Sequence, residues 1–288
     1  MKPELPIFFS TPRSRSTALQ TLAAPYMETV LGLLSLGYQT EFFQEYSHRY
    51  SFNDNRLDQK SRAEYFPLNR ENTPITHHFT YPPIYSSKSQ RDGHKLQVLQ
   101  NERAQGREYN IKIMSDDVLL NPGKDWRWDR GNLDFFSDRT FVITRRRNIK
   151  TLAFSLLVSL HTELWHKREN DKDGYQDLYD NPITINSELC TSIIPSLKST
   201  VMMDQFEEHI QKSGYKSHTF YYEDLVTLED MKDALDKVFN NKVWRGYLSD
   251  EYITNAMPQP LNLDYEKIIA NYDEISKKID SVLTYVVG

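Results

Sequence analysis

Short apolar runs alternate with longer amphipathic segments along most of this chain. The apolar run at 7–9, the alternating stretch at 109–114 and the compact run at 140–144 each have the pattern of a strand, and 217–222 follows the same pattern later. Strands that alternate with helices predict a parallel sheet covered by helices on both faces. We therefore expect an α/β protein.

The helical segments have apolar residues three and four positions apart. Thr227 and Asp230 form a variant of the capping box, which predicts a helix start. Pro25 falls inside the first helical segment, where it predicts a kink or an early end. The polar stretch 169–187 is expected to be a loop. The predicted helices cover residues 16–36, 149–165, 189–213 and 264–284, with another that begins at Thr227.

The length of the chain favours one domain with a sizeable core. Single α/β domains often reach 288 residues, so we expect a single domain over 1–288. The segment 51–108 is polar, lacks periodicity and is interrupted by prolines and a glycine. We expect this segment to be an insertion of loops and short helices over a substrate face.

Charge and cysteine content exclude several classes of protein. The formal net charge of -5 argues against general binding of nucleic acid, which needs a broad basic face. Cys190 is the only cysteine, so a disulfide within the chain is impossible and a cysteine-based metal site is disfavoured. No stretch approaches the roughly 18 apolar residues of a membrane span, and the first residues lack the pattern of a secretion signal. We therefore expect a cytoplasmic protein that binds neither nucleic acid nor membrane.

One loop concentrates the candidate chemistry, between the strand at 7–9 and the helix that starts near residue 16. Free backbone N–H groups and the positive end of the helix dipole converge at such a junction, which makes it an anion site. The alternative interpretation of this loop alone is a capped helix start with solvated arginines. The side chains expected to bind a phosphate here are Arg13, Ser14, Arg15, Ser16 and Thr17.

A second basic cluster follows the strand at 140–144. Arg147 lies just after this strand, and Ser155 lies two turns into the next helix. At about 1.5 Å per residue the two are roughly 12 Å apart along a helix axis, but a long arginine that reaches forward can share one ligand with a serine. The carboxyl ends of parallel strands are where such a ligand binds. Arg145 and Arg146 are expected to flank this site or to face solvent.

These motifs resemble those of the sulfotransferases that use 3'-phosphoadenosine 5'-phosphosulfate (PAPS). Residues 11–17, Thr-Pro-Arg-Ser-Arg-Ser-Thr, look like the family's 5'-phosphosulfate loop, usually written PRSGST or PKSGTT. Arg147 and Ser155 look like its 3'-phosphate motif, and Tyr222-Glu-Asp-Leu looks like its YEDL signature, whose tyrosine lies near the adenine. The resemblance implies a P-loop-type three-layer sandwich with a central parallel sheet flanked by helices, and PAPS as sulfuryl donor without a metal.

A finer match implies a catalytic base. Residues 41–44, Glu-Phe-Phe-Gln, look like a motif of the bacterial trehalose 2-sulfotransferase group, in which the glutamate is taken as the general base. Cytosolic relatives carry a base histidine where this chain reads Lys-Ile-Met at 112–114. Both points favour Glu41, with Glu45 as the second candidate. By the same resemblance Arg13 would stabilise charge on the leaving group, and the acceptor would be a hydroxyl of a carbohydrate or small metabolite.

The sequence also departs from the family pattern. Arg15 replaces the usual glycine of the loop, and Lys242 and Arg245 are the only candidates for the family's late phosphate loop. Two other classes therefore stay open. One is a P-loop kinase-like phosphoryl transferase, which would need Mg²⁺ and a Walker lysine that this loop lacks. The other is a non-catalytic relative that binds a nucleotide.

Overall fold

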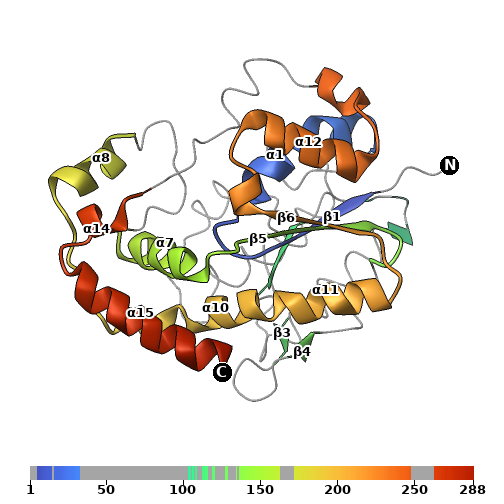
Figure 1. Ribbon diagram of the computed structural model, residues 1–288. Helices are drawn as coiled ribbons and strands as arrows, with labels where there is room; N and C mark the ends of the chain where they lie inside the picture. Colours follow the sequence, from blue (N-terminus) through green and yellow to red (C-terminus); the bar gives the residue numbers. More distant parts are fainter. Residues whose placement is uncertain are drawn as a thin grey trace, which may run out of the picture.

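The computed structural model describes residues 5–14, 16–32, 103–104, 106, 108, 112–115, 119–120, 127–128, 134, 136–162, 172–247 and 263–288. These residues form a mixed α/β fold around a parallel sheet, as the alternating pattern predicts (Figure 1). In the described part of the chain the sheet has four strands in the order β2-β1-β5-β6, and every pairing is parallel. The strands are β1 (Pro6–Ser10), β2 (Lys112–Met114), β5 (Thr140–Arg145) and β6 (Ser217–Tyr221). A separate antiparallel pair, β3 (Leu119–Leu120) with β4 (Arg127–Trp128), was not expected from the sequence.

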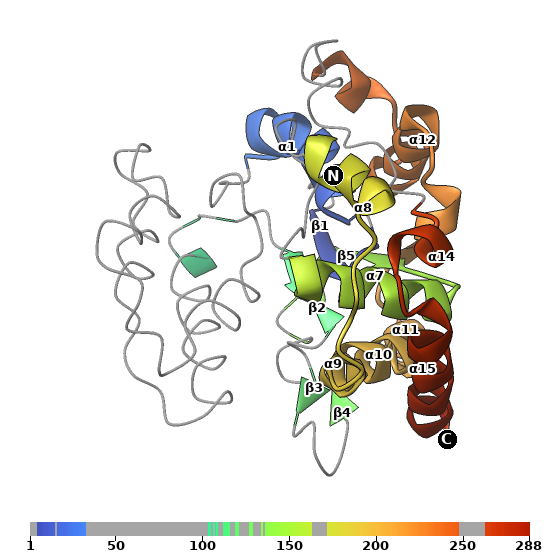
Figure 2. The same cartoon turned by 90° about the vertical axis from the view of Figure 1, so that its left-hand side faces the viewer.

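Helices cover both faces of the sheet. In Figure 1, α1 and α12 lie over one face, and α10 and α11 lie under the other, while Figure 2 shows α15 beside α10 and α7. The helices are α1 (Ser16–Thr29), α7 (Ile149–Thr162), α8 (Lys172–Asp180), α9 (Leu189–Ser192), α10 (Ile194–Val201), α11 (Met203–Lys212), α12 (Leu228–Phe239), α14 (Tyr265–Ile268) and α15 (Tyr272–Val287), with the 3₁₀ turns η3 (Tyr222–Asp224) and η4 (Val243–Tyr247).

The alternation of side chains along β1 explains why both faces are covered. Successive strand residues point to opposite faces, and all five residues of β1 are buried. Phe8 belongs to the apolar cluster that α1 and α12 complete. Its neighbour Phe9 lies on the opposite face, where its ring centroid is 5.3 Å from that of Phe141 and 5.0 Å from that of Phe206 of α11. A strand that is buried at every position therefore lies in the interior of the sheet, between β2 and β5.

The first helix is shorter than the sequence suggested. The expected helix at 16–36 ends at Thr29, although it does pass through Pro25. The amides of Val30 and Leu31 both reach the carbonyl of Tyr26, at 3.0 and 3.3 Å, and Gly32 follows with φ +66°. A left-handed glycine of this kind closes a helix end and carries the chain away.

The stretch 169–187 is not a loop throughout, so that expectation was wrong. It contains α8, which is anchored by tertiary contacts rather than by a strong apolar pattern. Leu178 is buried in the cluster around α7 and α15, and the hydroxyl of Tyr179 accepts a hydrogen bond of 3.0 Å from the amide of Asp264. Packing of two residues is enough to hold a short polar helix that lacks a long apolar stripe.

Two predicted long helices are interrupted. The segment 189–213 is three successive helices, and Pro195 lies in the first turn of α10, where a missing N–H costs least. The segment 264–284 is α14 followed by α15, with Ile269 between them in extended conformation. Ile269 forms an isolated parallel bridge with Ile183, so pairing with a distant segment takes the place of a continuous helix.

The predicted insertion and its boundaries fall on a part of the chain that the structure barely covers. Within 51–108 only residues 103–104, 106 and 108 are described, so the insertion and the single-domain organisation stay predictions. Among the helices of the described residues, none combines the length and apolar character that crossing a membrane requires.

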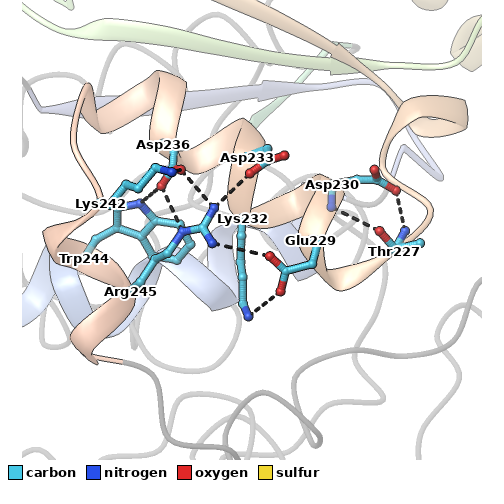
Figure 3. A network of polar contacts seen from close by, with 9 residues as sticks. All are labelled: Thr227, Glu229, Asp230, Lys232, Asp233, Asp236, Lys242, Trp244 and Arg245. Atoms are coloured by element: carbon cyan, nitrogen blue, oxygen red, sulfur yellow. Dashed lines mark hydrogen bonds and ion pairs between the residues drawn. The ribbon is translucent and has the colours of Figure 1, made fainter.

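A polar network joins α12 to the turn η4 (Figure 3). The predicted capping box is confirmed, since Thr227 and Asp230 exchange side-chain to backbone hydrogen bonds. Further along, the carboxylate of Asp236 accepts from Nε1 of the buried Trp244, at 2.9 Å, and from Nε of Arg245, at 3.1 Å. Arg245 also pairs with Asp233, at 2.8 Å. This candidate for a late phosphate loop is therefore engaged by carboxylates of α12.

We predict that Asp236→Ala lowers the free energy of unfolding by about 1–3 kcal/mol, because it leaves the buried N–H of Trp244 without an acceptor. Asp233→Ala is the matched control. Its carboxylate is 69% exposed in its pair with Arg245, so we expect a loss of only about 0.2–1 kcal/mol. Urea denaturation followed by circular dichroism measures both, and equal losses would contradict the assignment.

Candidate functional site

The candidate site lies where the carboxyl ends of three parallel strands meet. The chain leaves β1 at Ser10, β5 at Arg145 and β6 at Tyr221, and these residues lie at adjacent register positions. Figure 1 shows α7 and α14 beside this end of the sheet. In open parallel sheets this edge is the usual place for a ligand. Both predicted phosphate motifs therefore come to one edge.

The loop after β1 is held tightly to β5. The amide of Thr11 donates to the carbonyl of Thr144 at 2.9 Å, and the hydroxyl of Ser14 donates to the carbonyl of Thr11 at 2.7 Å. Ser14 Oγ also lies 3.0 Å from Oγ1 of Thr144. Arg13 takes φ +58°, a left-handed conformation that costs a non-glycine residue about 1–2 kcal/mol. The strained turn directs Arg13 toward α7.

Arg13 meets the second motif through Ser155. Its Nε donates a hydrogen bond of 3.0 Å to Oγ of Ser155, a buried side chain on α7. Tyr265 of α14 is the other hydroxyl group near this pair. Burial raises the pKa of Tyr265, although the hydroxyl of Ser155 and the charges of Arg146 and Arg13 act in the opposite direction. The cluster therefore combines two guanidinium groups with two hydroxyl groups, which suits an anion.

Arg147, the expected partner of Ser155, is engaged elsewhere. Its guanidinium makes a bidentate pair with Asp224 of η3, at 2.6 and 2.5 Å, and both side chains are about half exposed. This pair raises the pKa of Arg147 and lowers that of Asp224. The carboxylate of Glu223 accepts from the backbone amides of Arg147 and Asn148, at 3.1 and 3.2 Å. The YEDL segment therefore holds the junction between β5 and α7.

Of the two alternatives for Arg145 and Arg146, exposure to solvent was wrong, because both are buried. Arg145 is 8% exposed, and its Nη1 pairs with Asp204 and Glu207 of α11 at 2.7 and 2.9 Å. Burial alone would lower the pKa of Arg145, but these hydrogen bonds outweigh it and raise the pKa. Arg146 is 5% exposed, and its Cζ lies 3.7 Å from the ring centroid of Tyr222. One face of the predicted adenine-contacting ring therefore carries a guanidinium.

The remaining predicted site residues lie either at the start of α1 or outside the described residues. Ser16 is the buried first residue of α1. Thr17 is the next residue of that helix, and its side chain is not among those described. Arg15, Glu41 and Glu45 lie outside the described residues, so their roles stay predictions.

One residue of the cluster, Tyr265, was missed by the sequence analysis, and Arg146 was named there only as flanking the site or facing solvent. Tyr265 carries no motif, and its place depends on α14 folding back onto α7, where its ring stacks on Phe154 at 5.3 Å. Arg146 had a weak signal, since it lies just after the predicted strand, but nothing in the sequence separates it from its two arginine neighbours.

No known family model, curated protein or solved structure matches this chain.

We predict that Ser155→Ala lowers the free energy of unfolding by roughly 1–3 kcal/mol, because it removes the buried acceptor of the Arg13 Nε–H group. Ser159→Ala is the matched control, a buried serine one turn later whose hydroxyl donates only to the carbonyl of Ser155. A change below about 1 kcal/mol is expected there. The cluster would lose its assigned geometry if both variants unfolded at the same urea concentration.

Proposed function

We propose that this protein is a PAPS-dependent sulfotransferase with a P-loop-type arrangement of sheet and helices. The proposal rests on the two phosphate motifs and on the YEDL signature, and it takes the acceptor to be a hydroxyl of a carbohydrate or small metabolite. Glu41 would be the general base, and the 5'-phosphate would be held by the loop side chains and amides that precede α1.

One observation carries the proposal: Arg13 and Ser155, 142 residues apart, are joined by a hydrogen bond of 3.0 Å. These two residues come from the motifs assigned to the two ends of one donor molecule. If the loop were only a solvated helix start and the arginine run only a surface cluster, the two motifs would have no reason to contact each other. The donors that the described residues place around them are guanidinium and hydroxyl groups, which are chemically suited to phosphate.

The reaction would form a bond between the acceptor oxygen and sulfur while the bond from sulfur to the phosphate oxygen breaks, releasing 3'-phosphoadenosine 5'-phosphate (PAP). Glu41 would take the proton of the acceptor hydroxyl. Arg13 would stabilise the charge that develops on the departing phosphate oxygen. Such chemistry depends mainly on alignment and charge stabilisation, and the hydrogen bond to Ser155 fixes the direction of Arg13.

We predict that the protein binds PAP at least about tenfold more tightly than adenosine 5'-phosphate, because one charge-assisted contact to the 3'-phosphate is worth roughly 1.5–3 kcal/mol. Calorimetric titration measures both affinities, and Ser155→Ala should reduce the difference while Ser159→Ala leaves it unchanged. Equal affinity of the wild type for both ligands would reject the 3'-phosphate motif and leave only a general phosphate-binding protein.

We predict that Glu41→Gln lowers turnover by about 10²–10⁴-fold, the usual contribution of a general base, while its affinity for PAP stays within about twofold. PAP release from PAPS is followed with trehalose, the acceptor that the resemblance suggests first, and with a panel of other sugars. Glu45→Gln is the control and should keep its rate. Turnover that requires Mg²⁺ would favour a kinase-like enzyme, and PAP binding without turnover of the wild type would favour a non-catalytic relative.

A further inference from the structure

Unlike the other buried arginines of the described residues, Arg146 forms no ion pair with a carboxylate there. Among the described residues three arginines are buried: Arg139, Arg145 and Arg146. Arg139 pairs with Glu108, and Arg145 pairs with Asp204 and Glu207. Within the same part of the chain, Nε of all three has no hydrogen-bond partner, but only Arg146 also lacks one at Nη1, and Arg146 is in none of the ion pairs found there. A buried guanidinium without acceptors is unfavourable by several kcal/mol unless an anion compensates it.

Arg146 directly follows β5, at the end of the sheet where the candidate site lies. Its guanidinium stacks on the ring of Tyr222, with Cζ 3.7 Å from the centroid. A stack of this kind fixes the plane of the fork and leaves the N–H groups at its edge for an acceptor. Its charge also acts on the phenol of Tyr265, as does the hydroxyl of Ser155, the acceptor of Arg13. Arg146 thus belongs to the cluster in which the two motifs meet.

Arg147, by contrast, is not buried and has a carboxylate partner. Its guanidinium is about half exposed and already satisfied by a bidentate pair with Asp224. For Arg147 to bind a phosphate this pair would have to break, and the guanidinium would have to leave the ring of Tyr221, which it covers at 4.0 Å. Arg146 needs no such rearrangement.

We propose that Arg146, together with Ser155 and Tyr265, forms a phosphate-monoester subsite, and that Arg147 is a structural residue of the β5–α7 junction. The ligand class is a dianionic phosphate ester, and in the proposed sulfotransferase it is the 3'-phosphate of the nucleotide. This last assignment rests on the proposed function, whereas the subsite itself rests only on the buried guanidinium and the hydroxyl groups around it.

The experiment compares Arg146→Gln with Arg147→Gln in phosphate-free buffer. The probes are inorganic phosphate, PAP and adenosine 5'-phosphate, with chloride added to match ionic strength. We expect Arg146→Gln to weaken PAP at least about tenfold and to abolish the rise in melting temperature that inorganic phosphate gives the wild type. Arg147→Gln should bind PAP within about threefold of the wild type, and Arg146→Lys, which keeps the charge but loses the planar fork, should fall between.

A second measurement, the melting temperature without phosphate, distinguishes a role of Arg146 in binding from a role in stability. Without phosphate, Arg146→Gln should be as stable as the wild type or more stable, because it removes an uncompensated buried charge. An arginine with a purely structural role would instead lower the melting temperature in every buffer. If Arg146→Gln does not fold, Arg146→Lys gives the same comparison, since its affinity for PAP should drop while the fold is kept.

The outcomes distinguish this inference from the proposed function. If phosphate binding depends on Arg146 but the wild type does not distinguish PAP from adenosine 5'-phosphate, the subsite stands and the sulfotransferase proposal fails. If Arg147→Gln loses the preference for PAP and Arg146→Gln keeps it, the subsite assignment is overturned and the sulfotransferase proposal stands. If neither variant changes the binding of phosphate or PAP, the subsite is rejected.

Discussion

Three consecutive arginines, residues 145–147, lie at the carboxyl end of β5. The ion pairs and the ring contact that compensate their charge connect the surrounding elements to the sheet. Arg145 pairs with two carboxylates of α11, at 2.7 and 2.9 Å, and so connects the strand to the helix under one face. Arg147 pairs with Asp224 at the end of β6. Because a buried guanidinium is costly without acceptors, the pairs of Arg145 restrict where α11 can lie, and the half-exposed pair of Arg147 adds a connection to η3. Arg146, which lies between them, is left with an aromatic ring as its neighbour.

The Tyr222–Asp224 turn shows how one short segment serves both the fold and the proposed site. Glu223 accepts from two amides at the start of α7, where the free N–H groups of a helix need acceptors. Asp224 holds Arg147, and Tyr222 supports Arg146. The junction that results sets the direction of α7 and therefore the position of Ser155, two turns later. A role for YEDL in the geometry of the site needs no contact with an adenine ring.

Most of the fold followed from apolar periodicity, because the strands and the large helices bury one face or both. The fully buried β1 and β5 and the capping box at Thr227 were predictable for this reason. What failed depends on contacts with distant segments. The helix α8 is held through Leu178 and Tyr179, and the break between α14 and α15 follows from the bridge between Ile183 and Ile269. No local pattern encodes such pairings.

The place of the candidate site was predictable, but the partners of its arginines were not. Strand ends and a loop before a helix favour a candidate anion site from local sequence alone, and the structure joins the two motifs through Arg13 and Ser155 rather than through the expected Arg147. The choice among Arg145, Arg146 and Arg147 depends instead on carboxylates 59 to 77 residues away. Three consecutive arginines have nearly the same sequence pattern around them. Their roles can therefore be distinguished only by the residues that each one contacts in the folded protein. An arginine whose partners are fixed by the fold stabilises that fold, and an arginine buried beside the site without such a partner is the one suited to a ligand's charge.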